Sequence, residues 1–155
     1  MDEYQWIEGI VAVEAVLLAN SREVQTLYIG QDRFDGPVAR LQQLAQRMGV
    51  AYSRVPAGII AEAVPGSAHG GVVARVGARR MTELNDLLNL PRPVIFMLDG
   101  VEDPYNFGQA VRSLYAAGID GLIVPPRNWL SAAATVIRAS AGASEFMPSA
   151  VAEAN

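Results

Sequence analysis

One stretch of twenty residues, Pro93 to Arg112, most constrains what this chain can fold into. It opens with an unbroken apolar run, Val94 to Leu98, that ends abruptly at Asp99-Gly100. Such a run with a polar stop is typical of a strand in a parallel sheet, and we expect it to be fully buried. Asp103-Pro104 then suits the N-cap and first turn of a helix. The stretch therefore predicts a strand, a loop and a helix.

The helix that follows this loop shows a regular buried face. Small and apolar residues recur at helical spacing: Phe107, Ala110, Val111, Leu114 and Gly118. Ligands of open α/β sheets bind beyond the carboxyl ends of the strands. The polar residues expected at that edge are Asp99, Glu102, Asp103, Asn106 and, from the helix, Arg112. We expect the chemistry of the second half of the chain there.

Helical and strand patterns alternate along the rest of the chain. Helices are predicted over residues 9–20, 36–49, 57–63 and 84–88 and from Ser131 towards Gly142, and strands over residues 25–30, 51–55, 71–76 and 121–124. Trp6 is expected to pack on the first helix. The alternation predicts an α/β protein: a small α/β/α sandwich at residues 1–77, a linker at 78–92 and a parallel α/β domain at 93–155.

Composition narrows the classes of protein. About half of the 155 residues are apolar, which suffices for a core. No apolar run approaches the ~18 residues of a membrane span, and the amino terminus has the wrong charge for a signal peptide, so we expect no membrane and a cytoplasmic location. Cysteine is absent and His69 is the single histidine, so no transition-metal site is expected.

The charge balance is unusual for a nucleic-acid binder. The formal net charge is −4, whereas such proteins usually carry a basic surface. All twelve basic residues are arginine, which can contact phosphates and bases from few positions if they cluster. Codon bias explains the arginines equally well. One arginine recurs every seven residues, at Arg33, Arg40, Arg47 and Arg54. This spacing could place a basic stripe against RNA, but a solvated helix face is the more frequent cause.

The central stretch also carries a recognisable motif. Asp103 to Ser113, D-P-Y-N-F-G-Q-A-V-R-S, resembles the first signature motif of the SpoU (TrmH-type) RNA ribose 2'-O-methyltransferases of the SPOUT superfamily. In that motif an asparagine is followed six residues later by an arginine. Asn106 and Arg112 fill these two places.

Three further segments resemble the same family, in the same order. Ile137 to Pro148 resembles its small-residue segment, and Gly9 to Leu17 and His69 to Val76 resemble the start and end of its amino-terminal substrate-binding domain, a ribosomal-protein-like RNA-binding unit. The family commonly has His-Gln-Gly where this chain has His69-Gly70-Gly71. Four matches in order are together far more specific than each alone.

The resemblance implies a reaction and roles for particular residues. The reaction is methyl transfer from S-adenosylmethionine to a ribose 2'-hydroxyl of RNA, with ribosomal RNA expected over transfer RNA because of the extra domain. Asn106 and Arg112 are the expected catalytic residues, with Arg112 stabilising the developing alkoxide. The residues expected to contact RNA are Arg79, Arg80, Arg138, Ser140 and Gly142. No role follows for Glu145.

In the family, two further motifs build a deep trefoil knot that holds S-adenosylmethionine, and neither motif occurs before Asn155. We therefore expect an incomplete SPOUT-type domain without its knot region, with no cofactor-binding residue in this chain. The complete enzyme is expected to be a homodimer. The 155-residue chain alone is expected neither to bind the cofactor nor to turn over.

Several alternatives remain open from the residues alone. Asn106 could serve the helix start while Arg112 pairs with Glu102 or Asp103 on the surface. The chain could be a non-catalytic RNA-binding module, or a protein that binds Mg2+ through Asp99, Glu102 and Asp103. His69 could be a general base, although a turn residue is the more frequent role.

Overall fold

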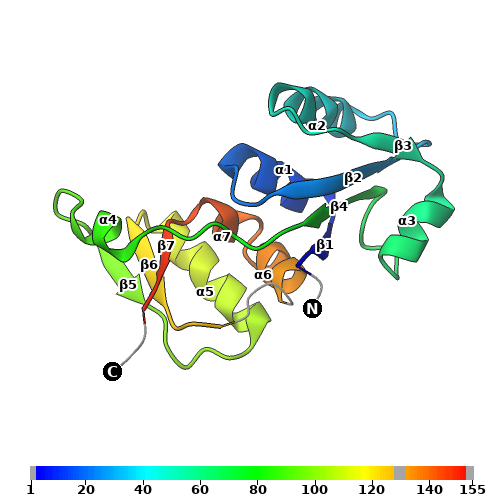
Figure 1. Cartoon of the computed structure of the whole chain (residues 1–155). Coiled ribbons are helices and arrows are strands. Elements are labelled where there is room, and N and C mark those ends of the chain that lie inside the picture. The colour runs from blue at the N-terminus through cyan, green and yellow to red at the C-terminus, as the bar shows by residue number, and fades with distance from the viewer. Residues whose placement is uncertain (1–2, 128–131, 153–155) are drawn as a thin grey trace. The chain divides into compact units, whose positions relative to one another are not determined.

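The computed structural model of the chain describes residues 3–127 and 132–152. The chain divides after Ala78 into two compact units (Figure 1). Each unit has its own sheet, with four strands in the first and three in the second. No helix among the described residues is long and apolar enough to cross a membrane.

The first unit alternates strands and helices, as the sequence predicts. Its elements are β1 (Gln5–Glu8), α1 (Ile10–Ala19), β2 (Val24–Gly30), α2 (Gly36–Arg47), β3 (Ser53–Val55), α3 (Ala57–Ala63) and β4 (Val72–Val76). The strand order is β1-β4-β2-β3. β4 is antiparallel to β1 and β2, whereas β3 is parallel to β2.

Strand β4 shows that both faces of this sheet are covered. Successive strand residues point to opposite faces, and Val72, Val73 and Ala74 are all fully buried. Helix α1 packs against α2 and β4, while α3 contacts β2 and β4. The helix predicted over residues 36–49 is α2, and its residues Val38, Leu41 and Leu44 are buried in the core. The first unit is thus an α/β/α sandwich.

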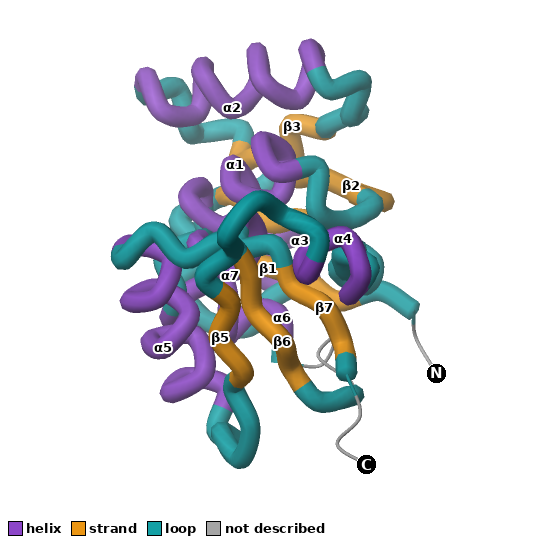
Figure 2. The backbone as a smooth tube through the Cα atoms, turned by 90° about the vertical axis from the view of Figure 1, so that its left-hand side faces the viewer, coloured by secondary structure: helices purple, strands orange, loops and turns teal. Residues whose placement is uncertain are grey.

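The second unit is built on a parallel sheet. Its elements are α4 (Leu84–Leu88), β5 (Ile95–Met97), α5 (Pro104–Ala116), β6 (Gly121–Val124), α6 (Ala133–Ala139), α7 (Ala143–Phe146) and β7 (Ser149–Val151). The strands run in the order β5-β6-β7, so β6 lies between the other two (Figure 2). All neighbouring strands of this sheet are parallel.

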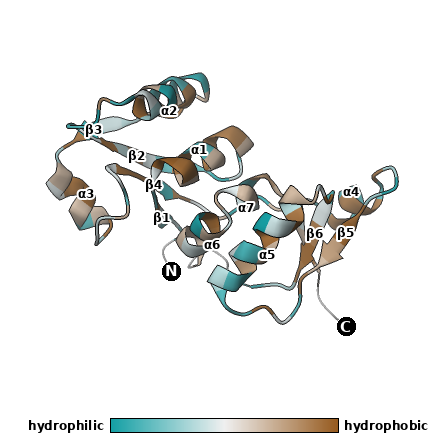
Figure 3. Ribbon diagram, turned by 180° about the vertical axis from the view of Figure 1, so that it is seen from behind, coloured by the Kyte–Doolittle hydropathy of each residue, from teal (hydrophilic) through white to brown (hydrophobic). Residues whose placement is uncertain are grey.

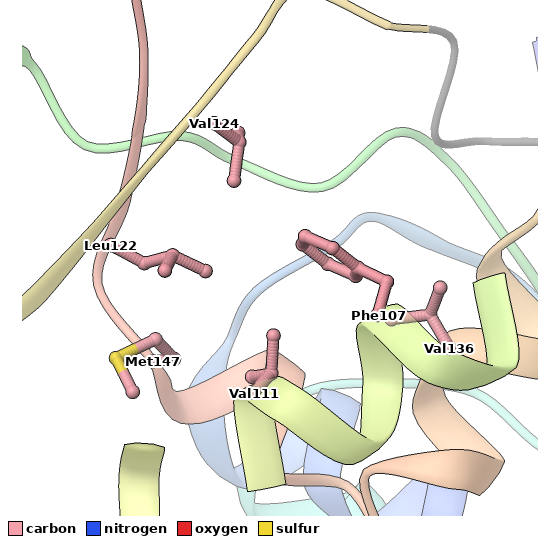
Figure 4. Close-up of a cluster of buried hydrophobic side chains, with 6 residues drawn as sticks. All are labelled: Phe107, Val111, Leu122, Val124, Val136 and Met147. Atoms are coloured by element: carbon pink, nitrogen blue, oxygen red, sulfur yellow. The ribbon is translucent and has the colours of Figure 1, made fainter. Parts of the chain in front are cut away.

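One face of this sheet carries the core of the unit. The buried side chains come from α5, β6, α6 and the residue after α7: Phe107, Val111, Leu122, Val124, Val136 and Met147 (Figure 4). Short helix α4 lies on the opposite face, because a Cβ added at Gly121, the neighbour of Leu122, would stand 3.0 Å from Leu87. Segment 78–92, predicted as a linker, therefore contains a helix that packs in the second unit.

The prediction of a fully buried strand at residues 94–98 is wrong. Among the described residues, β5 is an edge strand that pairs with β6 alone. Val94 is 53% exposed, Phe96 45% and Met97 64%. Figure 3 colours the ribbon of β5 as hydrophobic. An apolar run predicts a strand, but it does not say whether other elements cover both faces.

Three elements were not predicted as the structure has them. β1 contains Trp6, whose ring lies 5.7 Å from that of Tyr28 on β2. β7 lies where the sequence predicted no strand. The helix predicted towards Gly142 is divided into α6 and α7, because Ala141 and Gly142 adopt positive φ values of 51° and 85°. Ser131, its predicted cap, lies outside the described residues.

Candidate functional site

Helix α5 begins at the carboxyl end of β5, as the sequence predicts. The Asp103 carboxylate accepts the N–H of Asn106 at 2.8 Å and so caps the helix, and Pro104 occupies its first position. The Asp99 carboxylate accepts a hydrogen bond from the N–H of the next residue, Gly100, at 2.8 Å. The loop between β5 and α5 is therefore organised by its own aspartates.

Arg127 joins this loop to the end of β6. Its guanidinium donates to the carbonyl of Val101 at 3.3 Å and lies 3.9 Å from the Glu102 carboxylate. The carboxyl ends of β5 and β6 are thus neighbours at one edge of the sheet. Arg127 was not predicted as a site residue, although an arginine three residues after a parallel strand was a usable signal.

The acidic residues of this edge do not converge on one point. Asp99, Glu102 and Asp103 each have a different partner: a backbone N–H, Arg127 and the helix start. Among the described residues, no group of three histidine, cysteine, aspartate or glutamate side chains could hold a metal ion. The Mg2+ alternative therefore has no site in the part of the chain that the structure describes.

Arg112 lies exposed on α5 and makes no ion pair or hydrogen bond with any residue that the structure describes. The alternative in which it pairs with Glu102 or Asp103 is therefore not realised. The Asn106 side chain is also exposed, and Asp103 rather than Asn106 caps the helix. Both residues keep their polar groups available to a ligand.

The contact between α5 and α6 depends on Gly108. A Cβ at this position would stand 2.6 Å from the Ala139 Cβ and 2.8 Å from the Val136 carbonyl oxygen, far inside normal contact distance. The missing side chain therefore allows the two helix backbones to approach closely. One turn beyond Arg112, Tyr115 packs on Phe146 of α7 with ring centroids 6.2 Å apart.

Helix geometry locates Arg112 relative to these contacts. It lies one turn after Gly108 and one turn before Tyr115, and hence on the side of α5 that meets α6 and α7. Asn106 lies about 9 Å away along the axis and about 120° around it. The two residues flank the exposed face of α5, and no hydrogen bond links them. A ligand that meets both must extend across this face.

The α6–α7 segment is held by its own hydrogen bonds. Ser140 is 1% exposed, and its hydroxyl donates to the carbonyl of Ile137 and lies 3.1 Å from the Ser144 hydroxyl. Gly142 precedes α7 with a left-handed backbone. Arg138 is exposed. RNA contact at Arg138, Ser140 and Gly142 stays a prediction, and the structure gives Ser140 a role in shaping this turn.

Arg79 and Arg80, both expected to contact RNA, differ in their surroundings. Arg79 is half-buried, and its guanidinium donates to the carbonyls of Glu145 and Met147. Arg80 is exposed. Arg79 therefore anchors the start of the second unit to α7 and the residue after it. RNA contact at Arg79 and Arg80 stays a prediction.

In the first unit, His69 is a turn residue, as the more frequent role predicts. Its Nδ1 accepts the N–H of Gly71 at 2.9 Å, and its carbonyl accepts the N–H of Val72 at 3.0 Å.

The four arginines that recur every seven residues do not lie on one helix face. Arg40 and Arg47 lie on α2, whereas Arg33 precedes it and Arg54 lies on β3. The structure brings Arg33 and Arg54 together, as described below.

Comparison with known proteins gives the family. Residues 6–82 match the family model of the RNA 2'-O ribose methyltransferase substrate-binding domain, and residues 93–155 match that of the SpoU rRNA methylase family. The chain belongs to the SpoU family. The resemblance to the SpoU family is therefore confirmed.

Curated relatives agree with this assignment. The SpoU chain is 34% identical over 152 residues to a 23S rRNA (guanosine-2'-O-)-methyltransferase, RlmB, of Shewanella oneidensis, which covers 96% of this chain and 62% of the relative. It is 33% identical over 148 residues to RlmB of Escherichia coli K12, with 93% and 61% covered. The chain thus spans about 60% of the length of these relatives.

Solved structures confirm the fold. An rRNA methyltransferase from Sinorhizobium meliloti superposes with a TM-score of 0.73 at 22% identity, covering 97% of this chain and 55% of that one. The SpoU methyltransferase AviRb from Streptomyces viridochromogenes, in complex with AdoMet, gives 0.72 at 18% identity, with 98% and 56% covered. The predicted α/β class, a sandwich followed by a parallel SPOUT-type domain, is confirmed.

Proposed function

We propose that this chain supplies the RNA-binding unit and the first part of the catalytic unit of an RNA ribose 2'-O-methyltransferase. Its substrate would be ribosomal rather than transfer RNA, since the curated relatives named above act on 23S rRNA. The observation that carries the proposal is Arg112, which fills the arginine place of the SpoU motif with an exposed guanidinium that has no partner among the described residues.

Arg112 would act on the ribose through its charge. A guanidinium holds a phosphate with two parallel hydrogen bonds and stabilises negative charge that develops on a nearby 2'-oxygen. Its pKa above ~12 makes it a poor proton acceptor, so the hydroxyl proton leaves to phosphate or water. Asn106, on the other flank of α5, would hold the RNA through its amide.

The remaining predicted contacts divide into two roles. Arg80 and Arg138 are exposed and would bind phosphates. Arg79, Ser140 and Gly142 would position the α6–α7 segment, because Arg79 and Ser140 already hydrogen-bond within it and Gly142 sets its turn. Resemblance to the family further supports a homodimeric complete enzyme that acts in the cytoplasm.

S-adenosylmethionine would supply the methyl group when bound. At the carboxyl ends of β5 and β6, Asp99 and Asp103 accept hydrogen bonds within the β5–α5 loop, and Arg127 donates to the carbonyl of Val101 in that loop. We therefore propose no cofactor-binding residue in this chain.

Filter binding of the chain to 23S rRNA, with transfer RNA as competitor and salt varied from about 50 to 300 mM, tests the proposal. Each phosphate contact adds about one unit to the slope of log affinity against log salt. We expect Arg112→Ala to lower that slope by about one and Arg112→Lys to keep it. Arg92→Ala is the matched control, because Arg92 is exposed just before β5, at the amino end of the same sheet.

Each outcome is informative. A slope that Arg112→Ala leaves unchanged, in a chain that still binds rRNA, would favour a non-catalytic RNA-binding module. Preference for transfer RNA would overturn the proposed substrate. Methyl transfer from S-adenosylmethionine by the 155-residue chain alone would contradict the absence of cofactor-binding residues.

A further inference from the structure

The loop that leaves β2 presents an aromatic ring to solvent. Phe34 is 84% exposed, the largest value among the exposed large hydrophobic side chains of the described residues. Single exposed hydrophobic residues are common and need no explanation. Phe34 differs because neighbouring groups hold it in place.

Arg54 of β3 lies against one face of this ring. Its guanidinium carbon is 4.8 Å from the centroid of the Phe34 ring, within the range of a cation–π interaction. The same guanidinium donates to the carbonyls of Gln31 at 3.2 Å and Arg33 at 2.6 Å. Arg54 is thereby fixed to the loop that carries the ring. Because both acceptors are uncharged, these bonds do not neutralise its positive charge.

Two more arginines surround the same loop. The Arg33 side chain lies against the turn before β4, because a Cβ added at Gly71 would stand 3.0 Å from the Arg33 Cγ. The Arg33 guanidinium also forms an ion pair with the Asp35 carboxylate at 2.7 Å. On α2, the Arg40 guanidinium reaches back to the helix start, 3.6 Å from where a Cβ at Gly36 would be. The only acidic residues of segment 30–36 are Asp32 and Asp35, so this cluster of three arginines has a local positive excess.

We propose that Phe34, backed by Arg54, is a stacking platform for an unpaired base of the bound RNA. Arg33 and Arg40 would hold the phosphates that flank this base. The inference rests on the proposed function, because it assigns a contact surface to the RNA-binding unit. Stacking on an aromatic ring is sequence-tolerant, since every base has a π-face. The platform therefore selects unpaired over paired nucleotides rather than one base over another.

Fluorescence anisotropy with two labelled RNAs tests the platform in the whole chain. One probe is a hairpin with an unpaired loop, and the other is a fully paired duplex of equal length. Stacking of one base on an aromatic side chain contributes a factor of about 5 to 100 in affinity. We expect Phe34→Ala to weaken hairpin binding about tenfold and duplex binding less than twofold, and Phe34→Trp to restore hairpin binding.

Controls separate this inference from the proposed function. Leu18→Ala removes another exposed apolar side chain of the first unit, 58% exposed on α1, and is expected to change neither affinity. If the unmodified chain binds neither RNA, the proposed function itself fails. If it binds the hairpin and Phe34→Ala binds equally well, or loses both probes equally, the stacking platform alone is overturned. Thermal melting checks that each variant folds.

Discussion

At the scale of single residues, Gly108 sets the distance between α5 and α6. We expect Gly108→Ala to lower the free energy of unfolding of the second unit by about 1 to 3 kcal/mol, because the added methyl group overlaps the α6 backbone. Urea unfolding measures this change. Gly58→Ala on α3, where a Cβ would meet nothing within 4 Å, is the matched control and should be neutral or slightly stabilising. Equal effects at both glycines would contradict the packing explanation.

Arg79 and Arg80 are adjacent in sequence and are expected to respond oppositely to substitution. Arg79→Ala removes hydrogen bonds from a charged donor to two carbonyls and should cost about 1 to 3 kcal/mol of unfolding free energy. Arg79→Lys should recover only part, because one ammonium cannot reproduce the guanidinium fork. Arg80→Ala should change stability by about 0.5 kcal/mol or less and reduce RNA affinity instead. Calorimetric melting and filter binding distinguish the two.

Among the secondary-structure elements, β5 and β6 look alike in sequence but differ in burial. Leu122 on β6 is 1% exposed, whereas Met97 on β5 is 64% exposed. We expect Leu122→Ala to cost about 2 to 5 kcal/mol and Met97→Ala less than about 1 kcal/mol. Chemical denaturation of the two variants measures this difference. A similar cost at both positions would mean that β5 is covered in solution.

The start of α2 gives a pH-dependent prediction. The hydrogen bond from Arg33, with that from the N–H of Val38, lowers the pKa of the Asp35 carboxyl below its ordinary value. The folded state therefore favours the charged Asp35 carboxylate. The charged carboxylate stabilises the fold fully at pH values above the ordinary pKa of the unfolded chain, and this stabilisation is lost as pH falls through the lowered pKa of the folded state. NMR titration should show the Asp35 pKa rising in Arg33→Gln. An unchanged pKa would exclude Arg33 as the cause.

The positions of the helices and strands could be predicted from the sequence better than the tertiary contacts around them. Helical and strand periodicity located α2, α3, α4 and β6 closely, since these depend on local pattern. The break between α6 and α7 depends on the left-handed backbone at Ala141, a conformation that the residue type does not announce. Motif resemblance made Asn106 and Arg112 candidate site residues, whereas the Arg127 contact and the Phe34–Arg54 pair depend on tertiary proximity and could not be predicted from local pattern.

For the whole molecule, the two units are expected to share one RNA. Arg40→Gln in the first unit and Arg112→Ala in the second should each lower the salt slope of RNA binding by about one, and the double variant by about two. A double variant that behaves like one of the single variants would show that only one unit contacts the RNA. The test needs no knowledge of how the units are arranged.

The anchoring of Arg79 also bears on how the chain folds as it is made. The carbonyls that receive its guanidinium lie 66 and 68 residues later in the chain. At a synthesis rate of about 5 to 20 residues per second, Arg79 waits roughly 3 to 13 s for these partners. The first unit, complete at Ala78, can fold during that interval. The order of synthesis thus allows the first unit to finish folding while the second is still emerging from the ribosome.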